Sequence, residues 1–167
     1  MLQTERLSLR PFTLADGDAL FTLYGDRRVM SIRKIGLQTR DRSEAQLAEI
    51  VEHWRRRGFG LYAVYGRADG RFLGECGLRE RVPYGEEIEL SYGLIPETWG
   101  QGLAVEASRA VLDEGFARHG LRRIYAIARA DNARSRRVME KLGFRFLDDE
   151  AKGELRVVRY LLERAGD

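Results

Sequence analysis

The chain has 167 residues, 44% of them hydrophobic and 33% charged, a composition typical of a globular domain with its own core. Its 29 Lys and Arg residues nearly balance 26 Asp and Glu residues, and their dispersal argues against the basic face that nucleic-acid binding needs. No apolar run approaches the roughly 20 residues that span a bilayer, and the first residues do not form a signal peptide. We therefore expect one cytoplasmic domain over residues 1–167, a monomer or homodimer that binds neither nucleic acid nor membrane.

The residues suited to metal or thiol chemistry are few and scattered. The single cysteine, Cys76, excludes an internal disulfide, and His53 and His119 lie in separate predicted helices without metal-ligand spacing. Cys76 falls inside a predicted strand with no sequence neighbour that would activate its thiol. We therefore expect Cys76 to be a small core residue, and we expect no bound metal.

The N-terminal part of the chain predicts a strand and two helices. Residues 7–10 alternate apolar and polar side chains, and Asp16 is the expected N-cap of a helix with one apolar face. A second helix follows, with Asp41 or Ser43 as its N-cap and Gly58 as its end. The stretch 27–40 shows no clear pattern. The densest unbalanced basic segment begins there, and we interpret it as solvated surface: Arg33, Lys34, Arg40 and Arg42.

The rest of the chain predicts hairpins and two further helices. A hairpin is indicated by two β-type runs on either side of an Asp69-Gly70 turn. In chain order the expected elements are strands over 60–65 and 71–78, a turn at 83–86, a strand over 88–95, a loop over 99–104, a helix over 105–118, a strand over 123–128, a helix capped by Asp131 or Asn132, and a closing hairpin of strands 144–148 and 155–162. This order predicts an α+β fold, a mixed sheet covered by helices.

The stretch from Glu86 to Ala107 carries the first chemical signal. Its Gly-rich loop joins a strand to a helix, where unpaired backbone N–H groups and the positive end of the helix dipole suit a phosphate or pyrophosphate. Gly100 and Gly102 matter because a Cβ would hold the anion away from the backbone. A loop of this kind is also found in ordinary tight turns, so the rest of the chain must decide its role.

Four ordered segments together resemble one family. The segment E-L-S-Y-G-L-I-P-E-T-W-G-Q-G-L-A-V-E-A (89–107) resembles the acetyl-CoA-binding loop of the GNAT acetyltransferases, in the Rim-type branch that contains the ribosomal-protein Nα-acetyltransferases. Residues 4–12 (T-E-R-L-S-L-R-P-F), 58–78 and 131–144 (D-N-A-R-S-R-R-V-M-E-K-L-G-F) resemble that branch's opening strand, central hairpin and cofactor-side helix. The resemblance covers nearly the whole chain.

This resemblance implies a fold and a reaction. The fold would be GNAT-like, with a mixed, mostly antiparallel central sheet flanked by helices on both faces. The reaction would be transfer of the acetyl group of acetyl-CoA to a primary amine. The N–H groups of Gln101, Gly102, Leu103 and Ala104 would hold the pyrophosphate of the cofactor. Trp99 stands where the family often has Arg or Gln, so contact with phosphate there would come from the backbone.

The same resemblance assigns the remainder of the cofactor site. The pantetheine arm would lie against the strand over 89–95 like an added strand, with its amides paired to the backbone of Leu94 and Ile95. A backbone N–H there could also stabilise the tetrahedral oxyanion. Asn132 would bond the arm from the far side, although it also reads as an ordinary helix cap. Arg137 is the basic side chain that we expect at the phosphates of CoA.

The attacking amine must be neutral, which calls for a carboxylate acting directly or through water. Glu89 occupies the strand position at which many family members carry their acid, and Glu87 lies on the same face two residues earlier. Either carboxylate could instead be an ordinary solvated charge on the strand. We expect Glu89 to be the base.

The departing thiolate accepts a proton or a hydrogen bond. Met139 stands where many superfamily members have a tyrosine, so that common acid is missing here. Ser135 is the nearest hydroxyl on the same helix and is our expected donor. Tyr92, Tyr125 or the absence of any acid are the alternatives.

We therefore predict an acetyl-CoA-dependent N-acetyltransferase that works by direct transfer in a ternary complex, because no activated nucleophile is visible for a covalent intermediate. The resemblance implies a protein N-terminal α-amine as the acceptor. A small amine (a polyamine, an amino acid or an antibiotic) is the alternative acceptor. A catalytically silent acyl-CoA-binding module is the alternative of a different class.

Overall fold

The computed structural model of the chain describes residues 1–81 and 87–164. An eight-stranded sheet runs through it in the order β1-β2-β3-β4-β5-β6-β8-β7. All neighbouring strands are antiparallel except β5 and β6. The strands are β1 (Leu2–Gln3), β2 (Leu7–Pro11), β3 (Leu61–Gly66), β4 (Phe72–Glu80), β5 (Ile88–Leu94), β6 (Arg123–Arg129), β7 (Arg145–Lys152) and β8 (Leu155–Glu163). The predicted α+β fold with a mixed, mostly antiparallel sheet is confirmed.

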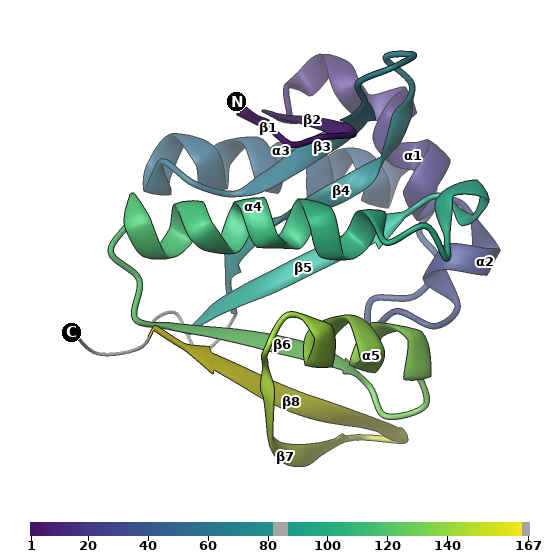
Figure 1. Cartoon of the computed structure of the whole chain (residues 1–167). Helices are drawn as coiled ribbons and strands as arrows, with labels where there is room; N and C mark the ends of the chain where they lie inside the picture. The colour runs from purple at the N-terminus through teal and green to yellow at the C-terminus, as the bar shows by residue number, and fades with distance from the viewer. Residues whose placement is uncertain (82–86, 165–167) are drawn as a thin grey trace.

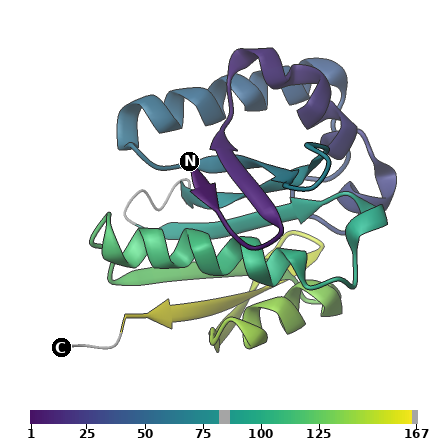
Figure 2. The same ribbon diagram turned by 45° about the horizontal axis from the view of Figure 1, so that its top comes forward.

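Helices cover both faces of this sheet (Figures 1 and 2). The helices α1 (Gly17–Tyr24) and α3 (Arg40–Arg57) lie on one face, and α4 (Leu103–Ala117) and α5 (Ala133–Lys141) lie on the other. A short helix, α2 (Arg27–Met30), and two 3₁₀ turns, η1 (Leu14–Asp16) and η2 (Pro96–Thr98), complete the elements. In the part of the chain that the structure describes, no helix is long and apolar enough to cross a bilayer.

The start of α3 differs from the prediction. Thr39 is its N-cap, and its Oγ1 accepts a hydrogen bond from the N–H of Arg42 at 3.3 Å. The predicted caps were wrong because the helix begins earlier: Asp41 lies in its first turn, and Ser43 is buried. Gly58 does end the helix, in the left-handed conformation (φ +72°) that glycine adopts without strain.

The structure also tests the predictions for Asp16 and Cys76. Asp16 stands at the N-cap position of α1, but its carboxylate accepts hydrogen bonds from the N–H of Thr13 and from Arg10 rather than capping that helix. Cys76 is fully buried, as expected, and burial raises the pKa of its thiol to about 12. The predicted turn at 83–86 lies outside the described residues.

The relation between β5 and β6 positions the site. These two parallel strands pair only at Glu89 with Tyr125 and at Leu90 with Ala126. Beyond those pairs the strands diverge toward their C-terminal ends (Figure 1). Backbone groups on the inner edges of diverging strands have no strand partner, so they can bind an added extended chain. The loop after β5 leads into α4 and the loop after β6 leads into α5, so both helices begin near this opening.

Candidate active site

A groove of about 340 Å³ runs from the end of β5 to the starts of α4 and α5. Seven of the ten residues predicted from the sequence line it: Leu94, Gly102, Leu103, Ala104, Asn132, Ser135 and Arg137. They come from two segments about 30 residues apart in the chain, which the fold brings to the two walls of one groove.

The N-terminus of α4 forms one end of this groove. Gly102 is its N-cap, in the left-handed conformation (φ +77°). The hydrogen bond from the N–H of Glu106 to the carbonyl oxygen of Gly102 closes the first turn (3.1 Å). The N–H groups of the first turn, those of Leu103, Ala104 and Val105, therefore have no partner within the helix. With the helix dipole they fit a phosphate. Val105 was missed because α4 begins two residues earlier than predicted.

Two of the predicted cofactor residues do not line the groove. The N–H of Ile95 donates to the carbonyl oxygen of Leu73 at 2.8 Å, so it is not available to a pantetheine arm. Gln101 turns its amide to the carbonyl oxygen of Glu97 (3.2 Å). Because backbone groups alternate between the two edges of a strand, the groups of Leu94 point to the edge opposite those of Ile95. Of the two predicted strand residues, only Leu94 is placed to bind the arm.

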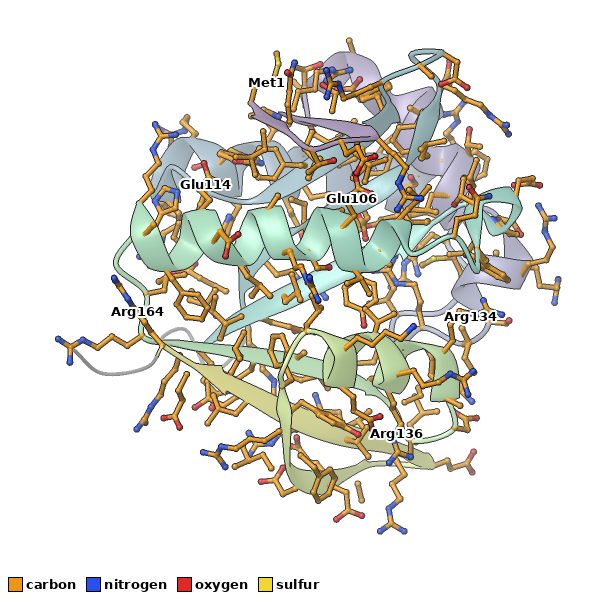
Figure 3. The ribbon with its side chains drawn as sticks, viewed as in Figure 1. Met1, Glu106, Glu114, Arg134, Arg136 and Arg164 are labelled. Carbon is orange, nitrogen blue, oxygen red and sulfur yellow. The ribbon has the colours of Figure 1, made fainter. Side chains whose placement is uncertain are left out.

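Side chains on α5 add positive charge along the same groove. Arg134, Arg137 and Lys141 all line it. The Arg134 guanidinium lies 3.8 Å from the centroid of the Trp99 ring, and Figure 3 shows this side chain at the start of α5. The Trp99 ring is partly buried against the core, and its Nε1 donates to the carbonyl oxygen of Leu94 at 2.9 Å. Trp99 thus holds the loop in place, and the cationic side chains come from α5.

The middle of the groove contains a pair of hydroxyl groups. The Tyr92 Oη and the Ser135 Oγ lie 2.8 Å apart, and the N–H of Ser135 donates to the Oδ1 of Asn132 at 3.1 Å. Asn132 therefore caps α5, whatever else it contacts. Burial raises the pKa of Tyr92 above its ordinary value, an effect that the hydrogen bond with Ser135 only partly opposes. Both hydroxyl groups are thus neutral hydrogen-bond donors at neutral pH. The alternative tyrosine, Tyr125, lines neither this groove nor the two cavities next to it.

A small cavity of about 60 Å³ adjoins the groove and contains the predicted base. Glu89 lines it together with Tyr92, Asn132 and Ser135, and the last three also line the groove. The Glu89 side chain is almost fully buried, with its Oε1 2.5 Å from the Nζ of Lys34 and 3.9 Å from Arg79. Burial acts to raise the pKa of Glu89, but Arg79 and Lys34 outweigh it and hold that pKa below its usual range. Glu89 is therefore ionised.

The basic segment before α3 contributes buried side chains rather than surface alone. The prediction of solvated surface was wrong for Arg33 and Lys34, whose side chains are only 15% and 23% exposed. The Nη2 of Arg33 lies 2.8 Å from Glu75 on β4, and Lys34 binds Glu89 on β5. Arg33 also lines both the groove and the small cavity.

A third cavity, of about 500 Å³, lies between the sheet and α3. Lys34, Arg79 and Glu89 line both this cavity and the small one, so the two are adjacent. Its walls carry charges of both signs, including Glu49, Glu80 and Lys152, the last from the closing hairpin. The groove, the small cavity and this outer cavity thus form a series across the sheet, with Glu89 between the last two.

Comparisons with known proteins identify this arrangement. Residues 6–145 match the family described as the acetyltransferase (GNAT) domain. A curated relative, the uncharacterized N-acetyltransferase YoaA of Bacillus subtilis (strain 168), is 30% identical over 164 residues, 96% of this chain and 88% of its own length. The chain therefore belongs to the GNAT acetyltransferase family. Members of this family use acetyl-CoA, and this chain is an N-acetyltransferase.

Solved structures show the same fold. A GNAT-family acetyltransferase from Bordetella pertussis superposes with a TM-score of 0.84 at 26% identity, over 96% of this chain and 97% of its own. RimL, a ribosomal L7/L12 α-N-protein acetyltransferase solved with coenzyme A, superposes with a TM-score of 0.82 at 18% identity, over 96% and 95%. At that identity the second comparison supports the fold alone.

Proposed function

We propose that this N-acetyltransferase transfers the acetyl group of acetyl-CoA directly to the α-amine of a protein N-terminus. The observation that carries the proposal is the small cavity, where an ionised carboxylate, Glu89, and a hydroxyl pair, Tyr92 and Ser135, line one space. The cofactor groove opens on one side of that space and the outer cavity on the other. Both substrates can therefore meet there without a covalent intermediate.

The residues along the groove divide the binding of acetyl-CoA between them. The free N–H groups of Leu103, Ala104 and Val105 suit the pyrophosphate, and Arg134 and Arg137 supply charge for phosphate groups. The free edge of β5 at Leu94 suits the amides of the pantetheine arm, which would pair as an added strand does. This course would bring the thioester to the small cavity beside Tyr92.

Glu89 and the hydroxyl pair then act on opposite sides of the thioester carbon. An acceptor ammonium entering from the outer cavity binds Glu89 and gives up a proton, to Glu89 or through it to water. The neutral amine attacks the thioester carbonyl carbon, a C–N bond forms and the C–S bond breaks. The thiolate accepts hydrogen bonds from Tyr92 and Ser135 and gains, relayed through them, the proton that the amine nitrogen or water releases. Each role follows from which cavity the side chain lines.

The weak basicity of Glu89 favours an α-amine as the acceptor. Its pKa lies below the usual range, so it removes a proton most easily from an amine that holds that proton loosely. An α-amine has a pKa near 8, whereas a lysine or polyamine ammonium has one above 10. The volume of the outer cavity, about 500 Å³, and the mixed signs of its charges also suit a peptide better than a polycation.

A thiol-release assay with a matched acceptor panel tests the proposal. The panel contains short peptides with a free N-terminus, the same peptides blocked at the N-terminus but carrying an internal lysine, and small amines that include a polyamine and amino acids. We expect release with the free peptides and little with the blocked ones. Thiol release with small amines alone would show that the acceptor is a small amine and not a protein N-terminus. Tight acetyl-CoA binding without release on any acceptor would favour the silent module.

A pair of glycine substitutions tests the cofactor end separately. Gly102→Glu puts a carboxylate at the proposed phosphate site and should weaken acetyl-CoA binding by about tenfold or more, measured by calorimetry. Gly120→Glu is the matched control, because Gly120 also has a positive φ (+65°) and a Cβ there would meet no atom of the described residues within 4 Å, but it follows α4 at the opposite end. Equal affinity of the two variants would remove the phosphate role of the α4 N-terminus.

A further inference from the structure

Lys34 is one of few lysines in this chain, and its side chain binds the buried carboxylate of Glu89. The chain carries 29 basic residues, and its lysines are Lys34, Lys141 and Lys152; the others are arginines. Lysine differs from arginine in one relevant way: its ammonium can lose a proton in a desolvated site, whereas a guanidinium stays charged. The lysine whose Nζ binds the buried carboxylate of Glu89 is thus a residue that can become a neutral amine.

The position of the Lys34 ammonium coincides with the place proposed for an acceptor. Its Nζ lies 2.5 Å from the Oε1 of Glu89, the contact that an incoming ammonium would make. Lys34 lines the small cavity together with Tyr92 and Ser135, which also line the cofactor groove. It lines the outer cavity as well. The resting protein therefore holds its own primary amine between the acceptor cavity and the expected thioester.

The surroundings of Lys34 also make its ammonium easier to deprotonate than a lysine in water. Burial lowers the pKa of its ammonium, and nearby Arg79 adds to that effect. Glu89 opposes the shift, but the pKa remains below its ordinary value. Lysine also carries its ammonium on a flexible four-carbon stem, which lets the Nζ move within the cavity.

We propose that Lys34 is an internal acceptor, which bound acetyl-CoA acetylates when no external amine is present; this rests on the function proposed above. The ammonium first gives one proton to Glu89 or through it to water. The neutral Nζ attacks the thioester carbon, the C–N bond forms and the C–S bond breaks. The nitrogen loses its second proton and the thiolate gains one through the Tyr92 and Ser135 hydroxyls. The products are Nε-acetyl-Lys34 and free CoA.

Acetylation would change the site in a defined way. The amide carries no charge, so Glu89 loses its partner at 2.5 Å and retains the more distant Arg79 at 3.9 Å. The acetyl group would occupy a cavity of about 60 Å³ that an acceptor amine must enter. Acetylated protein should therefore turn over external acceptors more slowly than unmodified protein.

The test incubates the full chain with acetyl-CoA and no acceptor, and follows each lysine by peptide mass spectrometry. We expect Lys34 to gain an acetyl group about tenfold faster than Lys141 and Lys152, because only Lys34 is held beside the thioester. Chain unfolded in urea is the control, and there the three rates should be equal. Lys34→Arg keeps a cation for Glu89 but should gain no acetyl group at position 34.

A second readout follows turnover after this incubation. Preincubation with acetyl-CoA should slow later thiol release with a good acceptor in the wild type but not in Lys34→Arg. Equal acetylation of the three lysines in the folded chain would overturn the proposal. Selective acetylation of Lys34 with no loss of turnover would confirm the internal acceptor and refute the expected slowing of turnover. No acetylation of Lys34 while external amines are turned over would refute the internal acceptor and leave the proposed function standing. If acetyl-CoA binds and neither process occurs, both proposals fail.

Discussion

Two buried carboxylates on neighbouring strands differ in what surrounds them. Glu75 on β4 accepts hydrogen bonds from Tyr24 and from Arg33, both at 2.8 Å, and is fully buried. Glu89 on β5 is almost as buried and is bound by Lys34, the residue next to Arg33. Glu75 lines neither the groove nor the small and outer cavities, whereas Glu89 lines both cavities.

The difference shows that burial and ion pairing do not by themselves mark a catalytic acid. Glu75 is enclosed by partners that leave no route to a substrate, so its pair with Arg33 fixes the segment 27–40 against the sheet. Glu89 is equally paired, but its partner is a flexible amine and open space lies on both sides of it. We therefore expect changes at the first pair to affect stability and changes at the second to affect turnover.

The largest expected effect is on stability, and it comes from breaking the ion pair between Arg33 and Glu75. Arg33→Met leaves Glu75 buried without its cation and should lower the free energy of unfolding by about 3–5 kcal/mol. Lys34→Met should lower it less, by about 1–2 kcal/mol, because Glu89 retains Arg79 and borders two cavities. Urea unfolding of the two variants measures both values. Equal losses would contradict the distinction between the pairs.

The next largest effect is on kcat/KM, and it comes from Glu89, the carboxylate that borders both cavities. Glu89→Gln should lower kcat/KM by about 100-fold at about pH 6, where an α-amine is almost wholly protonated, and by about tenfold or less at about pH 9. Since its pKa is below the usual range, Glu89 in the wild type stays ionised over this whole interval. The matched control is Glu87→Gln, two residues earlier, where the carboxylate binds Arg81 at 3.0 Å. A loss at Glu87 as large as that at Glu89 would remove Glu89 from its proposed role.

A smaller effect is expected at the hydroxyl pair. Tyr92→Phe and Ser135→Ala should each lower kcat by about tenfold with little change in acetyl-CoA affinity, and the double variant should lose no more than either single one, because the two hydroxyls act as a unit. Burial raises the pKa of Tyr92, so its phenol stays protonated and the wild-type rate should not fall up to about pH 10. Tyr125→Phe is the control. Fully additive losses would show that the hydroxyls act independently.

The sequence was most informative where the relevant interactions are local. Gly102 before a helix and Asn132 at a helix N-cap depend on neighbours within four residues, and both line the groove. The resemblance also placed Glu89 beside the expected reaction. The sequence therefore predicts where a residue lies in the site when the order of strand, loop and helix along the chain decides its position.

Other features depend on contacts that the order of residues does not reveal. The ion pairs of Arg33 and Lys34 join residues 42 and 55 positions apart, so a basic cluster that resembled surface became part of the site. Ile95 was assigned to the pantetheine arm, but which edge of β5 each N–H faces depends on its pairing with the neighbouring chain, and Leu73 takes that N–H.

The smallest predicted effect is on the pH dependence of the reaction, and it comes from Arg79, the second cation near Glu89. Arg79 pairs across the strands with Glu89, and its Nη2 lies 3.9 Å from the Glu89 carboxylate. Its charge lowers the pKa of Glu89, so Arg79→Met should raise that pKa. The carboxylate is the active form, and a higher pKa means that activity is lost at a higher pH as the solution is acidified.

The acid limb of kcat/KM should therefore move to higher pH in Arg79→Met, while the rate at about pH 8 changes by less than about twofold. The measurement needs an acceptor whose amine has an unusually low pKa, so that protonation of the amine does not hide protonation of Glu89. Tyr24→Phe removes a partner of the enclosed Glu75 instead, and it should leave this limb in place. A limb that moves in Tyr24→Phe but not in Arg79→Met would mean that the enclosed carboxylate, and not the open one, controls the reaction.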